Sequence, residues 1–120
     1  MQYVAGKCNI GRKNRAKRIV IGAAFLVSAF FIYYLITGNQ LDKTFLMMLF
    51  PIFSLGFLTI IEAAKGFCVF YALNGTYNFD SSEVEVVSAA DRAKDKMKAL
   101  EILLIAVAAA AVATGIFYFI

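Results

Sequence analysis

Three long apolar stretches separated by short polar connections dominate the chain. The least ambiguous stretch is 102–120, which runs for nineteen residues without a charge. At about 1.5 Å rise per residue it nearly matches a hydrocarbon core of roughly 30 Å, so it predicts a membrane-spanning helix. Residues 19–36 and, less cleanly, 45–61 predict two further spans. The expected fold is all-α, an integral membrane protein with three transmembrane helices forming a single membrane domain.

The connections refine this picture. Pro51 lies within the second span and predicts a kink near residues 47–51. Residues 62–88 predict an interfacial segment and linker, in which 66–79 is either re-entrant or interfacial and 80–87 is a short strand or extended linker. Ser88 followed by Asp91 resembles a helix cap, so 89–120 is expected to form one long helix. At about 48 Å, that helix would extend roughly three turns beyond the membrane.

Composition limits the chemistry that the chain could perform. Of its 120 residues, 62% are hydrophobic and 17% are charged, and histidine is absent. Histidine is the commonest ligand of haem, copper and catalytic zinc and the commonest general base near neutral pH. We therefore expect no metal, no cofactor and no enzymatic activity.

Charge predicts the orientation in the membrane. The first eighteen residues carry six cations and no acid, the first connection carries one cation, and the second carries five. The positive-inside rule then predicts a multi-pass protein of the cell membrane with a cytoplasmic amino terminus and an outside carboxyl terminus. Anionic lipid headgroups are the expected partners of these cations, rather than nucleic acid. The candidate headgroup ligands are Arg12, Lys13, Arg15, Lys17 and Arg18.

Small residues four positions apart indicate close helix packing. Ala24 and Ser28 form one such pair in the first span, although an ordinary lipid-facing helix explains them equally well. The third span has three pairs on more than one face, which favours two neighbouring helices, one of them from another chain of the same or a different kind. The alternative is that alanine is simply a good helix former. The three pairs are Ala106 with Ala110, Ala109 with Ala113, and Ala111 with Gly115.

The chain has two cysteines. Cys8 precedes the first span and Cys68 follows the second, so a helical hairpin would return both to the same side of the membrane and they could meet. Two thiols are too few for structural zinc unless a dimer supplies four, whereas a redox or persulfide role needs only one or two. The competing interpretation is that each is a small buried apolar residue.

Two segments carry a family resemblance. The sequence CNIGRKNRAKRIVIG at 8–22, together with GFCVFYALNGT at 66–76, resembles a small two-helix family that anchors some inner-membrane rhodaneses. The likeness covers about residues 8–79, and the third helix lies outside it. Val69 replaces a frequent proline, Asn14 replaces a frequent aspartate, and these residues include no rhodanese domain. The resemblance implies a helical hairpin whose two cytoplasmic motifs fold together, bringing Cys8 near Cys68.

These observations favour a non-catalytic accessory or scaffold subunit of a larger membrane complex. One candidate host is a membrane-bound oxidoreductase, such as an archaeal ammonia or copper monooxygenase. The alternative is a membrane-embedded protein that handles thiols or sulfur through Cys8 and Cys68 at the cytoplasmic face. A homo-oligomeric channel is disfavoured because the spans lack a polar stripe to line a pore.

Overall fold

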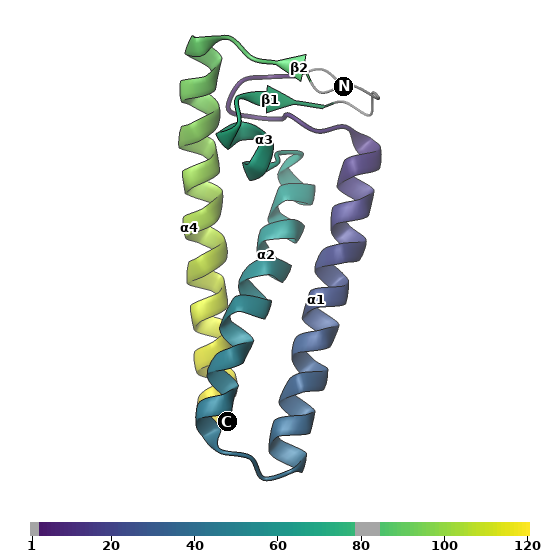
Figure 1. Cartoon of the computed structure of the whole chain (residues 1–120), viewed down its shortest axis with the longest axis vertical. Helices are drawn as coiled ribbons and strands as arrows, with labels where there is room; N and C mark the ends of the chain where they lie inside the picture. Colours follow the sequence, from purple (N-terminus) through teal and green to yellow (C-terminus); the bar gives the residue numbers. More distant parts are fainter. Residues whose placement is uncertain (1–2, 79–84) are drawn as a thin grey trace.

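The computed structural model describes residues 3–78 and 85–120, and three long helices dominate it. Helix α2 (Leu49–Lys65) lies between α1 (Arg12–Gly38) and α4 (Ala89–Phe119), as Figure 1 shows. Each of the three is long and apolar enough to cross a membrane, α2 together with the short helix that precedes it. The expected all-α fold with three membrane-spanning helices is confirmed.

The third span forms the second half of one long helix, as predicted. Ser88 caps α4, since its hydroxyl oxygen accepts a hydrogen bond from the Asp91 N–H at 3.3 Å. The helix then continues without interruption to Phe119. Its first turns stand beside the amino-terminal segment, and its far end lies near the turn that joins α1 to α2 (Figure 1).

The second span begins differently from the prediction. A 3-10 helix, η1 (Lys43–Met48), leads directly into α2, and Asp42 caps it by accepting the Thr44 N–H at 3.1 Å. Pro51 therefore lies in the first turn of α2. Proline is tolerated there because the first N–H groups of an α-helix have no partner within that helix. The expected kink within the span is not confirmed.

Helices α1 and α2 cross at two glycines. A Cβ atom at Gly22 would lie 2.5 Å from Cγ1 of Ile60 and 3.1 Å from the carbonyl oxygen of Gly56. No side chain fits in this space, so glycine allows the two backbones to approach. The buried residues of α1 are Gly22, Ala29 and Ile36, each seven positions from the next. This spacing is typical of nearly parallel helix packing.

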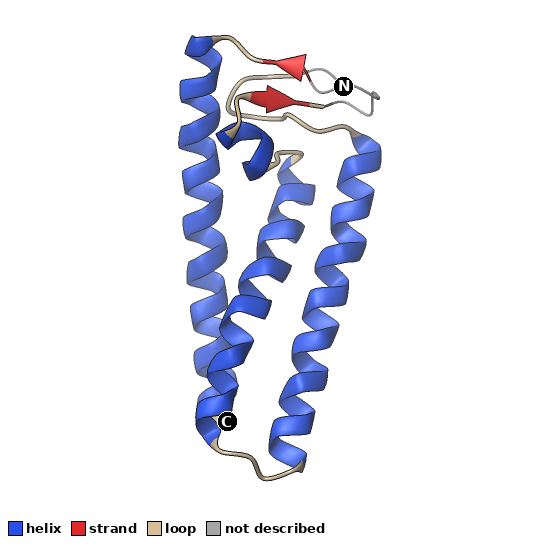
Figure 2. Ribbon diagram, in the orientation of Figure 1, coloured by secondary structure: helices blue, strands red, loops and turns tan. Residues whose placement is uncertain are grey.

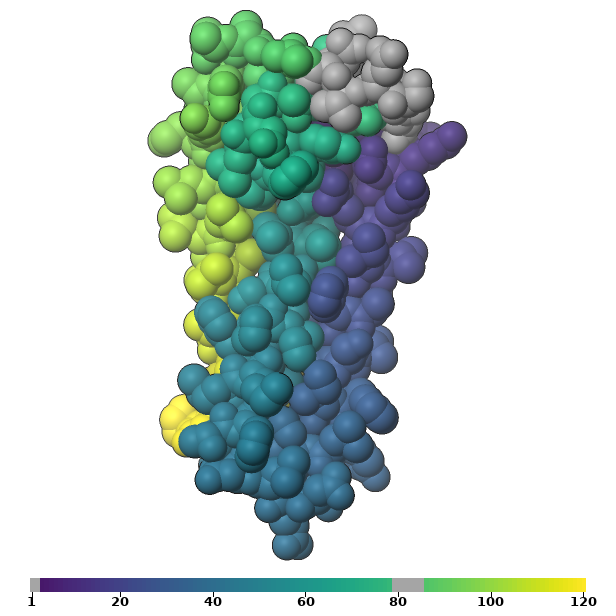
Figure 3. All heavy atoms as spheres, in the orientation of Figure 1, coloured from purple at the N-terminus to yellow at the C-terminus, as the bar shows by residue number. Residues whose placement is uncertain are grey.

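Helix α4 packs against α2 with a similar repeat. Ala99, Ile102, Ala106, Ala110 and Thr114 are all buried and lie three or four positions apart. Near the far end, Phe117 joins the three helices, because its ring packs against those of Tyr33 on α1 and Phe53 on α2, with centroids 4.8 and 5.5 Å away. The bundle is thus one packed unit, as the space-filling view also shows (Figure 3).

A small cap covers the opposite end of α2. It consists of the amino-terminal segment 3–11, residues 66–78 and residues 85–88, and we call it the cap below. Residues 66–78 contain the short helix α3 (Val69–Leu73) and strand β1 (Thr76–Tyr77). Strand β1 pairs antiparallel with β2 (Glu85–Val86), which confirms a short strand in this region (Figure 2). The other residues assigned to that strand or linker, 80–84, lie outside the described part.

Candidate functional site

The cap is built from the two sequence motifs that lie on either side of the helical hairpin. The backbone N–H groups of Asn9 and Ile10 donate to the Gly66 carbonyl at 2.9 and 3.3 Å. The Asn9 side chain, which is fully buried, pairs with the backbone of Cys68 at both of its polar atoms. Its amide oxygen accepts the Cys68 N–H at 2.6 Å, and its amide nitrogen donates to the Cys68 carbonyl at 3.0 Å. The two motifs therefore fold together.

A second set of backbone bonds extends this contact. Asn78 donates its N–H to the Asn9 carbonyl at 2.9 Å, and its own carbonyl accepts the Gly11 N–H at 3.1 Å. Ile10, which lies between them, is fully buried. These bonds satisfy four backbone polar groups of the cap within the chain itself.

Arg15 closes the end of α2 under the cap. Its Nε donates to the Ala63 carbonyl at 2.8 Å and its Nη2 to the Ala64 carbonyl at 3.2 Å. The last carbonyls of a helix have no hydrogen-bond donor within it and carry partial negative charge. The Arg15 guanidinium supplies both the donors and a positive charge. Gly66 follows with φ of +67°, the left-handed conformation that ends many helices.

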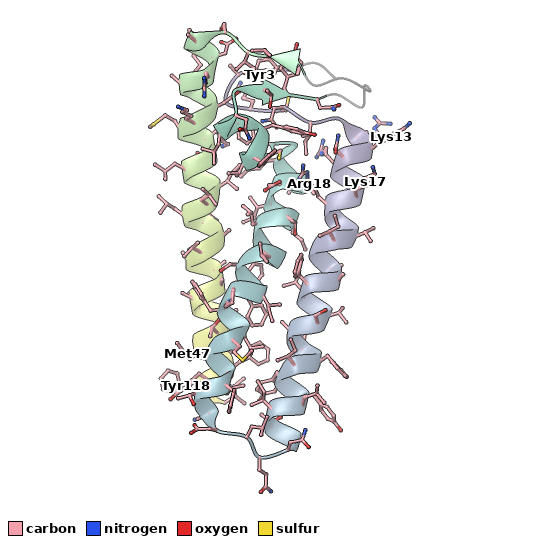
Figure 4. All side chains as sticks on the ribbon, viewed as in Figure 1. Tyr3, Lys13, Lys17, Arg18, Met47 and Tyr118 are labelled. Atoms are coloured by element: carbon pink, nitrogen blue, oxygen red, sulfur yellow. The ribbon has the colours of Figure 1, made fainter. Side chains whose placement is uncertain are left out.

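Arg18, one turn further along α1 than Arg15, forms an ion pair within the chain. Its Nη1 lies 2.6 Å from Oε2 of Glu62, and the Glu62 side chain is only 5% exposed. Two of the five candidate headgroup ligands, Arg15 and Arg18, are therefore engaged within the chain. Arg12, Lys13 and Lys17 are exposed, and Figure 4 shows Lys13 and Lys17 on the outer side of α1 and Arg18 between α1 and α2. Lipid binding by these residues stays a prediction.

The two cysteines lie in adjoining parts of the cap. Cys68 is 3% exposed, whereas Cys8 is half-buried in a turn closed by backbone bonds between Val4 and Cys8. Burial raises the pKa of the Cys68 thiol, and the nearby Glu62 carboxylate adds to this effect. A protonated, enclosed thiol is a weak nucleophile. Within the described residues, no three His, Cys, Asp or Glu side chains gather as a metal site would require.

Asp95 is a buried carboxylate that sequence reasoning missed. It lies on α4, is fully buried, and accepts the Tyr3 hydroxyl at 2.6 Å and the Gly6 N–H at 2.7 Å. The spacing of charges on α4 predicts instead a surface pair between Asp95 and Lys98, and this expectation is wrong. Lys98 pairs with Glu101 at 3.4 Å, because Asp95 faces the amino-terminal segment.

The aromatic ring of Tyr3 completes this contact. It stacks on the ring of Tyr77 in β1, with centroids 4.3 Å apart. Burial and the hydrogen bond to Asp95 raise the pKa of the Tyr3 hydroxyl above its ordinary value. Asp95 and Tyr3 thus tie the beginning of the chain to the third helix.

The small residues proposed for helix packing lie in different environments. Ala24 and Ser28 are exposed, because α1 packs against α2 through Gly22 and Ala29 instead. On α4, Ala106 and Ala110 are buried within the bundle, Ala109 and Ala113 are half-buried, and Ala111 is exposed. Packing of the exposed ones against another chain stays a prediction.

Ala111 and Gly115 line an apolar groove of about 510 Å³ between the end of α4 and the beginning of the second span. Met47 and Tyr118 lie close together at this end in Figure 4. A Cβ atom at Gly115 would have no atom within 4 Å. The other lining residues are Phe50, Thr114 and Phe119.

The helical hairpin and the cap motifs on either side of it match a known family. Residues 6–79 match the family described as inner membrane protein YgaP-like, transmembrane domain. The chain belongs to the YgaP-like transmembrane family. The matched residues include both Asn9 and Cys68, whose contact joins the two motifs. The match confirms the family resemblance, which implied that these motifs fold together. Comparisons with curated proteins and with solved structures gave no match.

The third helix lies outside the matched residues. Asp95, on this helix, contacts Gly6 at the start of the matched region and Tyr3 just before it.

Proposed function

We propose that this YgaP-like membrane protein is a non-catalytic accessory or scaffold subunit of a larger membrane complex. The observation that carries the proposal is the groove lined by Ala111 and Gly115, which is apolar and open on the side of the bundle. Transmembrane helices associate where small residues let backbones approach closely. We infer that this groove receives a transmembrane helix of the partner subunit.

The internal packing supports a scaffold role. Gly22 and Gly56 bring α1 and α2 into close contact, and Phe117 joins all three helices, so the bundle can present a fixed surface. In the membrane-spanning half of α4, Ala108 and Ala111 are exposed and lie near large exposed side chains such as Val112. The membrane-bound oxidoreductase named in the sequence analysis stays a hypothesis for the identity of the host.

The test is gentle detergent extraction of the native chain followed by mass analysis of the proteins that travel with it. We expect a stoichiometric partner that is lost in Ala111→Leu and Gly115→Leu, since a leucine would fill the groove. Ala108→Leu is the matched control, because Ala108 is exposed on α4 but does not line the groove. Migration of the native chain alone as a monomer would refute the proposal.

The alternative function, thiol or sulfur handling by Cys8 and Cys68, is less well supported. Cys68 is enclosed by the cap and its pKa is raised, and its backbone, rather than its sulfur, forms the contact with the amino-terminal segment. Replacing Cys68 by serine separates the two functions. Loss of a sulfur-transfer or thiol activity with unchanged complex assembly would favour the alternative.

A further inference from the structure

A groove on the outer face of α1 combines an apolar floor with a cation. It has a volume of about 390 Å³ and is lined by Ala16, Lys17, Val20 and Ile21. Val20 and Ile21 are 69% and 46% exposed, so no other part of the described chain covers them. The small side chain of Ala16 leaves the hollow beside Lys17. The groove lies on a different helix from the one that carries the proposed function.

The position of the groove matches the boundary of the membrane. Lys17 belongs to the basic first turns of α1, and Val20 lies near the start of the apolar part of the same helix, residues 19–36. A lysine at such a boundary extends its ammonium toward the headgroups while its methylene groups cover apolar surface. A ligand in this groove therefore meets positive charge at one end and hydrocarbon-like surface at the other.

The charges around the groove favour an anion. No acidic residue occurs among the first eighteen residues, and Lys17 is the one cation that lines the groove. Arg15 and Arg18 do not contribute to this face, because they bind the end of α2 and Glu62. Within the described residues, no ion pair involves Lys17.

We propose that this groove is a binding site for one anionic phospholipid, with its phosphate on Lys17 and the first part of an acyl chain along Val20 and Ile21. A free phosphate would leave the apolar floor uncovered, and a neutral lipid would leave the ammonium without a counter-charge. An amphipathic anion satisfies both ends of the groove.

The absence of tryptophan from the chain provides a direct assay. A single Val20→Trp reporter is reconstituted in vesicles of phosphatidylcholine with a minor fraction of brominated phosphatidylglycerol, and separately of brominated phosphatidylcholine. Bromine quenches the reporter whenever that lipid lies against residue 20, so the ratio of quenching at equal fractions of the two brominated lipids measures the preference of the groove. We expect phosphatidylglycerol to be preferred about fivefold, the effect of one lysine near an anionic surface.

Two substitutions made with the reporter test the residue assignment. Lys17→Gln should reduce the preference to near one, whereas Lys96→Gln, which removes the same charge from an exposed position on α4, should leave it unchanged. An equal preference for both lipids in the native background, or equal loss in both variants, would overturn the proposal. Absence of quenching by either lipid would also overturn it, because a second protein would then cover the groove.

Discussion

The buried carboxylate of Asp95 offers the sharpest test of how the cap is held. Asp95→Ala removes the acceptor of two hydrogen bonds, from Tyr3 at 2.6 Å and from the Gly6 N–H at 2.7 Å. Hydrogen bonds to a charged group contribute about 1.5–3 kcal/mol each. Solvent screens the Tyr3 hydrogen bond, because this side chain is only half-buried, so we assign that bond a smaller contribution. We expect a total loss of about 2–4 kcal/mol in the free energy of opening the amino-terminal segment.

Hydrogen exchange of the Gly6 amide measures this opening directly. The expected loss corresponds to roughly 30-fold to 700-fold faster exchange in Asp95→Ala, by the ratio of about 1.4 kcal/mol per tenfold change. Asp95→Asn should give an intermediate rate, since its amide oxygen still accepts one bond. Asp91→Asn, one turn earlier on α4, is the control for lost charge and should leave the Gly6 rate nearly unchanged. Unchanged protection of Gly6 in Asp95→Ala would refute the reasoning.

Three further substitutions or conditions test other contacts. Gly22→Leu should destabilise the bundle by about 1–3 kcal/mol through overpacking against α2, whereas Ala23→Leu on the exposed face should not. Thermal unfolding in detergent compares the two variants. Equal stabilities would contradict the close approach of α1 and α2 at Gly22. Arg15→Gln should increase hydrogen exchange at the end of α2 and in the Gly66 loop, because two carbonyls lose a charged donor; exchange identical to the native chain would be the opposing result. In a Cys8→Ser background, alkylation of Cys68 should be slow at neutral pH. It should still accelerate above the pH at which an exposed thiol reaches its full rate, since burial raises the pKa; a plateau at the ordinary thiol pKa would argue against this.

The spans could be predicted from sequence because hydrocarbon imposes a length and a polarity that the chain displays openly. The same holds for the start of α4, where Ser88 and Asp91 form a local helix-capping pattern that the sequence displays. The joining of the two motifs followed from family resemblance, since nothing in the spacing of Asn9 and Cys68 indicates that an asparagine amide pairs with a distant backbone.

The features that the sequence did not reveal concern residues whose role depends on tertiary contacts. Asp95 looks like an ordinary surface charge, because only the folded chain shows that the amino-terminal segment lies over it. Arg15 and Arg18 resemble their exposed neighbours in sequence, yet the 3.6-residue turn of α1 directs them toward α2. The kink expected at Pro51 is not confirmed, and the sequence did not reveal that the 3-10 helix η1 precedes α2 and so places this proline in the first turn of α2.

The fold also shows how the third helix, which lies outside the matched residues 6–79, packs against the family region. Helix α3 and Phe67 pack against Ala99 and Ile102 of α4 in one buried cluster, and the Asp95 contact lies one turn further along. The third helix thus contacts residues 66–78 of the cap as well as α2. A partner that binds α4 would therefore bind an element directly connected to the cap.

The central claim of this account is that three helices cross the membrane and place the cap and the α1–α2 turn on opposite sides of it. Labelling of single cysteines by a membrane-impermeant reagent tests this most directly, in a chain lacking Cys8 and Cys68. Gly38→Cys at the turn and Ala90→Cys at the start of α4 are suitable sites, since Gly38 has no neighbour within 4 Å of a Cβ atom and Ala90 is exposed. We predict that Gly38→Cys is labelled on intact cells and Ala90→Cys only on inverted membrane vesicles. Labelling of both positions from the same side would contradict the account.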